Sequence, residues 1–223
     1  MQRAEFHCHT IYSKDSLTAP DKLIAVCLKK GITTIVITDH NTITGAIHAK
    51  RLAPQLVVVG EEIMTKEGEL LAFFVKEEIP AGLGAIETIN LLRDQGAFIS
   101  VSHPFDQYRE GHWEERDLLE ITPLIDAIET FNARCMREEF NSLAEAFANK
   151  YNLLGTVGSD AHTLMEVGKA SLLLPDFNNR ETLIEALASS EKLVSLSSPW
   201  IHLTSRYATW KKKVQIILKK FTH

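Results

Sequence analysis

Histidine and carboxylate residues recur in this chain directly after short apolar runs that read as β-strands. His7 and His9 follow the first such run, and Asp160 and His162 follow a later one. Because alternate residues of an extended strand point to the same side, each pair can direct two side chains at one place. Several strand ends that bring such groups together at one end of the sheet are typical of a metal-dependent enzyme on an α/β barrel. Three further polar segments of this kind are Thr38-Asp39-His40-Asn41, Gly60-Glu61-Glu62-Ile63 and Ser102-His103-Pro104.

Strands and helices alternate along the sequence, which favours a mainly parallel sheet, open or closed. The 223 residues suffice for one domain of this kind. We expect that domain over residues 1–195, followed by a basic amphipathic helix within 196–223. The hydrophobic patterns predict strands at 3–8, 34–38, 56–59, 69–75, 97–101, 125–129, 153–157 and 170–174. They predict helices at 20–31, 42–53, 86–95, 134–150 and 180–188.

Composition places the chain among cytoplasmic globular proteins. Its apolar content of 45% is ordinary, and no apolar run reaches membrane-spanning length. The first predicted strand begins close to Met1, so we expect no signal peptide. Cys8, Cys27 and Cys135 are odd in number and lack paired spacing, so we expect all three to be reduced.

Charge divides the chain into an acidic body and a basic end. The net charge is −5, yet no acidic residue follows Glu191. An acidic body is expected where carboxylates bind cations, and it disfavours long nucleic acids as partners. The C-terminal segment has two interpretations: a helix docked on the domain, or a helix that contacts an anionic membrane surface or partner. Its apolar residues follow three-four spacing: Leu203, Tyr207, Trp210, Val214, Ile217, Leu218 and Phe221.

The polar segments, in order and over most of the chain, resemble those of the polymerase-and-histidinol-phosphatase (PHP) family. The first of them extends from His7 to Ser16, and the last is Gly158-Ser159-Asp160-Ala161-His162. The resemblance implies a distorted (β/α)7 TIM-like barrel with two or three divalent metal ions. It also implies hydrolysis of phosphate esters, with a hydroxide that bridges the metals as the nucleophile.

The resemblance implies three groups of ligands. One metal would be held by His7, His9, Glu62 and Asp160. Glu62 would bridge to a second metal on His103. A third metal would be held by Asp15, His40 and His162.

Glu69 marks a departure from the family pattern, because some members carry a Gly-His pair where this chain has Gly68-Glu69. Glu69 either completes the second metal site or accepts a hydrogen bond from His103. Mixed imidazole and carboxylate ligands without cysteine suit Zn, Mn or Fe(II).

Other residues are candidates for supporting roles. Asp39 is adjacent to His40 and points to the other side of the strand, so we interpret it as an orienting group. A phosphate also needs cationic donors beside the metals. Lys14, Arg109 and Arg134 are candidates for that task, or are ordinary solvated cations.

The sequence therefore predicts a metal-dependent phosphoesterase that acts on a small phosphorylated metabolite or nucleotide. The main alternative is a 3′–5′ exonuclease or nucleotide phosphodiesterase. A non-catalytic scaffold is disfavoured, because a buried cluster of His and carboxylate is costly to keep without metal.

Overall fold

The computed structural model describes residues 1–221, except for the side chains of residues 216 and 219–221. Its strands are β1 (Gln2–Glu5), β2 (Thr34–Ile37), β3 (Val57–Met64), β4 (Glu69–Phe73), β5 (Phe98–Val101), β6 (Ala127–Asn132), β7 (Leu154–Gly158), β8 (Ala170–Leu174) and β9 (Glu191–Val194). Its helices are α1 (Pro20–Lys29), α2 (Thr44–Leu52), α3 (Ala85–Asp94), α4 (Glu115–Ile121), α5 (Glu138–Tyr151), α6 (Arg180–Leu187) and α7 (Ile201–Phe221), with a 3₁₀ turn at Thr122–Leu124.

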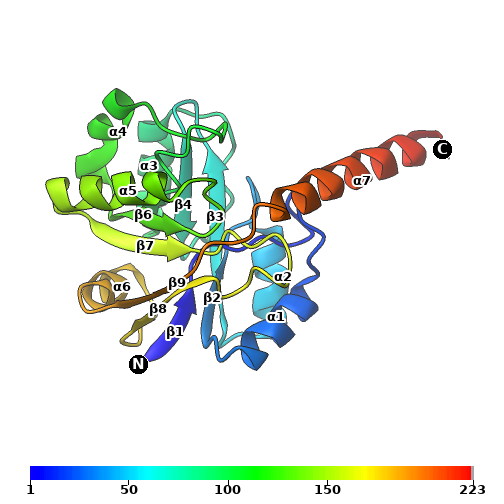
Figure 1. Ribbon diagram of the computed structural model, residues 1–223, viewed down its shortest axis with the longest axis horizontal. Helices are drawn as coiled ribbons and strands as arrows, with labels where there is room; N and C mark the ends of the chain where they lie inside the picture. Colours follow the sequence, from blue (N-terminus) through cyan, green and yellow to red (C-terminus); the bar gives the residue numbers. More distant parts are fainter. Residues whose placement is uncertain (222–223) are drawn as a thin grey trace.

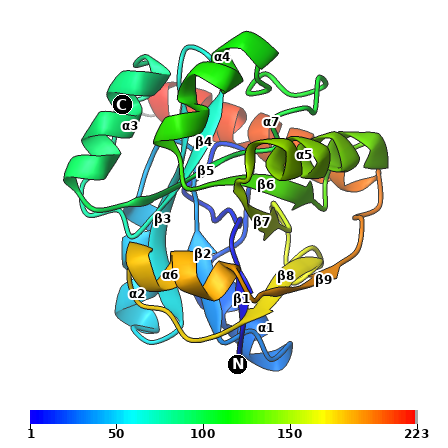
Figure 2. The ribbon, with the colours of Figure 1, turned by 90° about the vertical axis from the view of Figure 1, so that its left-hand side faces the viewer.

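All strands belong to one sheet, in the order β7-β6-β5-β4-β3-β2-β1-β8-β9. β4 runs antiparallel to both β3 and β5, whereas β1–β3 and β5–β7 are parallel sets. Just beyond β1 and β7, Cys8 and Ala161 form a parallel bridge, and His9 N–H donates to the Ala161 carbonyl at 2.9 Å. Strands β1–β7 therefore nearly close into a barrel, and β8 pairs antiparallel with residues 2–4 of β1 (Figures 1 and 2). This confirms the expected distorted barrel of the α/β class.

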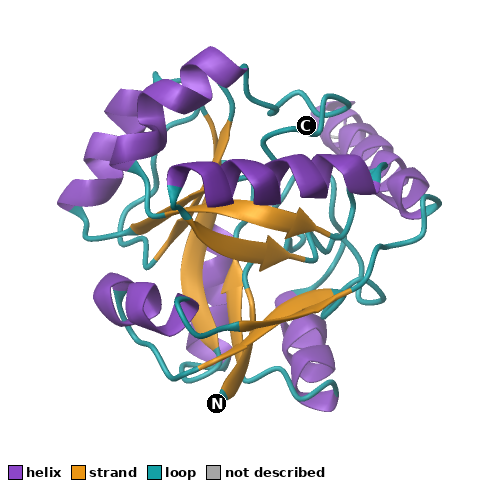
Figure 3. Cartoon of the chain, turned by 60° about the vertical axis from the view of Figure 1, so that its left-hand side comes forward, coloured by secondary structure: helices purple, strands orange, loops and turns teal. Residues whose placement is uncertain are grey.

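The helices lie outside the sheet (Figure 3). All four residues of β2 are buried, because α1 and α2 cover its outer face. Cys8 packs in that outer layer against Leu23 and Cys27, which leaves its neighbours His7 and His9 to face inward. All three cysteines are buried and free, as expected.

Gly60 lets β3 lie close to the strands on both of its sides. A Cβ at this position would lie 2.6 Å from Val36 Cγ1 in β2 and 2.8 Å from the Ala72 carbonyl oxygen in β4. The strand that carries Glu62 can therefore sit deep in the barrel.

The elements differ from the sequence prediction at several points. The strand predicted at 3–8 is Gln2–Glu5, the one predicted at 125–129 is Ala127–Asn132, and four further differences bear on the site or the topology. β3 continues to Met64, so Glu62 lies inside the strand. α5 begins at Glu138, which leaves Arg134 in the turn after β6, where Asn132 Oδ1 accepts from the Arg134 N–H at 2.9 Å. α4 was not predicted because seven residues show little periodicity, and β9 was not predicted because its residues are exposed.

α7 contacts the barrel with one face and extends away from it (Figure 1). Ile201 and Ala208 are buried. Among the described side chains, the predicted apolar stripe lies on the other side of the helix, and its Tyr207 and Trp210 are 54% and 60% exposed. The helix thus docks through a different face from its apolar stripe. The Phe221 side chain and residues 222–223 lie outside the described part, within which no helix has the length and hydropathy to cross a membrane.

Candidate metal centre

Glu62 lies at the centre of the histidine cluster. Its Oε1 is 3.3 Å from His7 Nε2 and 3.2 Å from His103 Nε2. Its Oε2 is 3.3 Å from His9 Nε2 and 3.0 Å from His40 Nδ1. One buried carboxylate therefore contacts four imidazoles from three other strand ends, which is the geometry expected of a bridging ligand.

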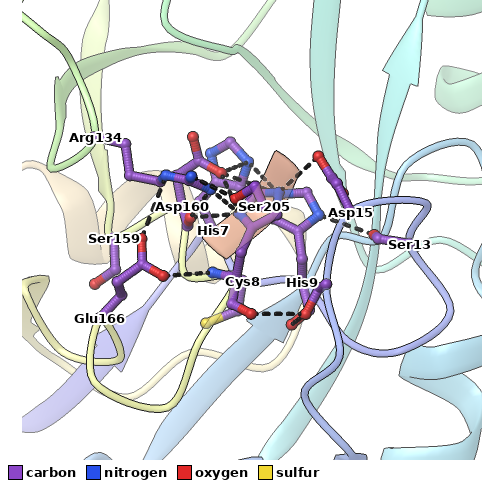
Figure 4. A network of polar contacts seen from close by, with 12 residues as sticks. His7, Cys8, His9, Ser13, Asp15, Arg134, Ser159, Asp160, Glu166 and Ser205 are labelled. Carbon is purple, nitrogen blue, oxygen red and sulfur yellow. Dashed lines mark hydrogen bonds and ion pairs between the residues drawn. The ribbon is translucent and has the colours of Figure 1, made fainter. Parts of the chain in front are cut away.

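Asp160 faces the same cluster from the end of β7. Its Oδ1 lies 3.2 Å from His9 Nε2, 3.7 Å from His7 Nε2 and 3.3 Å from His162 Nδ1 (Figure 4). Its backbone is left-handed, with φ of 50°, and that of His103 has φ of 23°. Such conformations are unfavourable for residues other than glycine, and they often occur at functional sites.

Asp15 adds a carboxylate from the loop between β1 and α1. Its Oδ2 lies 3.1 Å from His162 Nε2 and 3.5 Å from His40 Nε2. Ring nitrogens of His9, His40 and His162 lie within 4.8 Å of one another. The three residues expected to hold a third metal are therefore close together.

Glu69 also joins the cluster. It begins β4 opposite Met64 of β3, and its two carboxylate oxygens lie 3.6 Å from His40 Nδ1 and 3.5 Å from His103 Nε2. The structure thus brings together all nine residues that the sequence nominated as ligands. Direct ligation by Glu69 stays a prediction.

The donor set fits divalent metal ions. Among the described residues, several buried polar atoms of the cluster have no hydrogen-bond partner, a costly arrangement that bound cations would relieve. These atoms include Asp15 Oδ1, His40 Nδ1, Glu62 Oε2, His103 Nε2 and Asp160 Oδ1.

The electrostatics of the cluster also favour cations. Burial raises the pKa of Asp160, but Arg109 and His7 outweigh that effect, so this pKa lies well below its usual value. Burial followed by the positive fields of His162 and His40 lowers the pKa of His9 to about 3. His9 is thus a neutral imidazole beside an ionised carboxylate, the protonation state that metal ligation requires. Burial lowers the pKa values of His7 and His40, but Glu62 and the other carboxylates outweigh it and raise both, that of His40 to about 9, so the cluster attracts positive charge. The pKa of Glu69 is raised by burial and by the like charge of Glu62.

Glu129 fixes the orientation of His7. Its Oε1 accepts from His7 Nδ1 at 2.9 Å, so His7 Nε2 is left to face Glu62. Its Oε2 accepts from the backbone N–H of His103 at 2.9 Å and from Asn132 Nδ2 at 3.0 Å. Sequence analysis did not predict a role for Glu129, although it is the last residue of the run predicted at 125–129 and the other site residues lie at or just after the ends of theirs.

Asp39 supports His9 through Ser13. His9 Nδ1 lies 3.1 Å from Ser13 Oγ, which donates to Asp39 Oδ1 at 2.8 Å. Asp39 also accepts from the backbone N–H and the hydroxyl of Thr10, both at 2.6 Å. This geometry agrees with the orienting role expected for Asp39.

Glu5 supports the far side of the site. It accepts from the backbone N–H of Ser159 at 2.9 Å and from that of Gly168 at 2.9 Å, next to Asp160. Burial raises the pKa of Glu5 to about 7. Glu5 was also missed, although it has the same strand parity as His7 and His9.

The two candidate arginines lie at the site. Arg109 Nη2 donates to Asp160 Oδ2 at 2.7 Å. Arg134 is only 3% exposed, and its guanidinium contacts His162 Nδ1, Glu166 and the Ser205 hydroxyl (Figure 4). Lys14, by contrast, is exposed on its loop, and its substrate role stays a prediction.

A cavity of about 400 Å³ opens beside these arginines and the metal cluster. One side of it is formed by α7. The residues around it are Asp15, Asp106, Tyr108, Arg109, Arg134, Met136, His162, His202, Ser205 and Arg206.

Comparisons with known proteins establish the family. Residues 5–59 match the PHP domain, and residues 138–191 match the PHP-associated region. The uncharacterized protein MJ0417 of Methanocaldococcus jannaschii is 37% identical over 179 residues, which cover 79% of this chain and 72% of that protein. The chain belongs to the PHP family.

Solved structures share the fold. A two-domain protein of Bacteroides vulgatus that contains a predicted PHP-like metal-dependent phosphoesterase aligns with a TM-score of 0.70 at 18% identity, over 86% of this chain and 64% of that one. The lesion-specific endonuclease PfuEndoQ of Pyrococcus furiosus aligns with a TM-score of 0.56 at 12% identity, over 89% of this chain and 59% of that one.

Proposed function

We propose that this chain is a metal-dependent phosphoesterase that hydrolyses a phosphate ester of a small molecule. The observation that carries the proposal is Glu62, whose carboxylate lies within 3.3 Å of four imidazole nitrogens beside a cavity that two arginines line. Divalent ions held there would activate water for attack and withdraw charge from the phosphoryl oxygens. Zn, Mn and Fe are the metals that this donor set suits, in two or three sites.

Arg134 and Arg109 would bind the phosphoryl group. Both line the cavity, and each is held in place by a carboxylate, Glu166 for Arg134 and Asp160 for Arg109. A guanidinium that is fixed in this way loses little conformational freedom when it binds a phosphate. The chain thus supplies positioned donors next to the metal cluster.

The size of the cavity supports a small substrate. A volume of about 400 Å³ lies within the range of small-molecule sites. The net charge of −5 disfavours long polynucleotides, and all of the acidic residues lie in the body, up to Glu191. Three free cysteines support a reducing, cytoplasmic setting.

The test is a metal and substrate survey of the purified protein. We expect elemental analysis to find bound divalent metal. We also expect Mn, Zn or Fe(II) to support phosphate release from small phosphomonoesters in preference to bis(p-nitrophenyl) phosphate and single-stranded DNA. Faster release of nucleotides from the DNA would favour the exonuclease alternative. Full metal content without hydrolysis of any ester would favour a non-catalytic scaffold.

A further inference from the structure

The first turns of α7 are fixed against the candidate active site. Arg134 Nη2 donates to Ser205 Oγ at 2.6 Å. Lys212 Nζ donates to the carbonyl oxygens of Ile11 and Ser13, in the loop that carries Asp15. The helix is therefore tied to both an arginine and a metal-side loop of the barrel, and it forms one side of the substrate cavity.

α7 is not part of the segments that match the PHP family models. Those segments are residues 5–59 and 138–191, and α7 begins at Ile201. α7 forms one side of the cavity, so contacts between α7 and a substrate are suited to decide which substrate is accepted.

Three residues of α7 present polar groups to the cavity, and one of them, Ser205, is already bonded to Arg134. His202 and Arg206 are four residues apart, so they lie on the same side of the helix, one turn from each other. Arg109 and Arg134 are already paired with carboxylates. No carboxylate of the described residues forms an ion pair with Arg206, which is exposed at the rim. The rim of the cavity therefore carries a cation that the protein itself does not neutralise.

We infer that Arg206, with His202 beside it, binds a second anionic group of the substrate, apart from the phosphate ester that is hydrolysed. This inference rests on the proposed function and narrows its substrate class to small phosphorylated molecules that also carry a carboxylate or another phosphate. Arg134 and Arg109 serve the ester phosphate near the metals, and Arg206 serves the distal anion at the rim.

The test measures binding rather than turnover. The metal-loaded protein is titrated calorimetrically with propylphosphonate, 3-phosphonopropionate and propane-1,3-bisphosphonate. We expect at least one of the two doubly anionic compounds to bind about tenfold more tightly than propylphosphonate. The compound with the larger gain identifies the distal anion as carboxylate or phosphate.

The matched variants are Arg206→Ala and Lys213→Ala. Lys213 is also an exposed cation and lies seven residues on, two turns further along the same side of α7. We expect Arg206→Ala to reduce the tenfold preference to within about twofold, and Lys213→Ala to keep it. An equal preference in the wild type and Arg206→Ala, no preference in the wild type, or equal losses in both variants would overturn the inference.

Failure of the anion-site inference can be distinguished from failure of the proposed hydrolase function. If the protein shows an Arg206-dependent preference but hydrolyses no phosphate ester, the assignment of the anion site stands and the hydrolase proposal fails. If it hydrolyses esters and Arg206→Ala changes neither affinity nor the selectivity of kcat/KM between singly and doubly anionic esters, the anion site is refuted.

Discussion

His7 Nδ1 and Glu129 Oε1 lie 2.9 Å apart in a fully buried pair against the backbone of β7. A Cβ on Gly158 would come within 2.2 Å of Glu129 Oε1 and 2.4 Å of His7 Cβ, so this position requires glycine. The pair fixes the ring of His7 and directs its other nitrogen at Glu62. A carboxylate in this position also makes the imidazole a better metal ligand.

Glu129→Gln should weaken metal binding without removing a ligand. The amide keeps the shape of the side chain but loses its charge, so we expect metal affinity to fall about 10–100-fold. Competition with a chelator measures this change. Glu120→Gln, at an exposed position of α4, is the control and should bind metal as the wild type does. Unchanged affinity in Glu129→Gln would contradict the orienting role.

His9→Ala and Asp160→Ala should each abolish phosphate release. Both side chains contact the same part of the cluster, 3.2 Å from each other. We expect kcat to fall by about 10³-fold or more, because the metals generate the nucleophile. His48→Ala provides the matched control, since His48 is exposed on α2 and bonds only to the Tyr12 hydroxyl among the described contacts. Near-normal turnover in either folded site variant would refute a mechanism built on this centre.

Substitutions of Glu69 distinguish a metal ligand from a supporting group. If Glu69 ligates a metal, Glu69→Leu should lose one equivalent of metal and most activity, whereas Glu69→His should keep both. We expect this result, because Glu69 lies 3.5 Å from His103 and 3.6 Å from His40. The measurement is metal stoichiometry, with circular dichroism as a check on folding. Full stoichiometry in Glu69→Leu would exclude direct ligation.

Asp126 should make stability depend on pH at the other end of the barrel. Burial raises the pKa of Asp126, but hydrogen bonds from Arg180 and Arg93 outweigh it, so its pKa in the folded protein lies below the ordinary 3.8. The contribution of the ionised carboxylate is therefore complete above pH 3.8 and is lost as the pH falls through the lower, folded value.

We expect Asp126→Asn to lower the free energy of unfolding by about 2–3 kcal/mol at pH 7. The difference from the wild type should shrink as the pH falls below 3.8. Urea unfolding across this range measures it, and Asp94→Asn, at the exposed end of α3, is the control. A pH-independent difference would show that the effect of the substitution is not electrostatic.

The exposed stripe of α7 predicts a contact with an anionic membrane surface. Tyr207 and Trp210 lie exposed on a basic helix that carries Lys211 and Lys213, and no acidic residue follows Glu191. We expect co-sedimentation with vesicles that contain phosphatidylserine, and weaker binding by Trp210→Ser. Leu119→Ser, at an exposed apolar position of α4, should bind as the wild type does. Self-association in ultracentrifugation without vesicle binding would point instead to a second copy as the partner.

The order of polar segments along the sequence, together with the family resemblance that it carries, was sufficient to predict the barrel and the cluster. Strand alternation is a local property, so His7 with His9, and Asp160 with His162, could be placed on one face before any tertiary contact was known. Asp39 could be separated from His40 by the same alternation. The family resemblance then supplied the grouping of the ligands, and the structure brings those residues together.

Other features depend on contacts between distant segments. The pairing of Glu129 with His7 joins residues 122 positions apart, and the closure of the barrel at Cys8 and Ala161 joins two loops. The face of α7 that contacts the barrel also could not be predicted from the sequence, because a three-four pattern shows where the apolar side chains lie but not what they contact. Periodicity reports the geometry of one segment, whereas packing depends on the neighbours that the whole fold brings to it. The sequence by itself thus determined which His and carboxylate side chains could reach the candidate metal centre. Only the tertiary structure decided which residues hold those side chains in place, and that α7 forms one side of the substrate cavity.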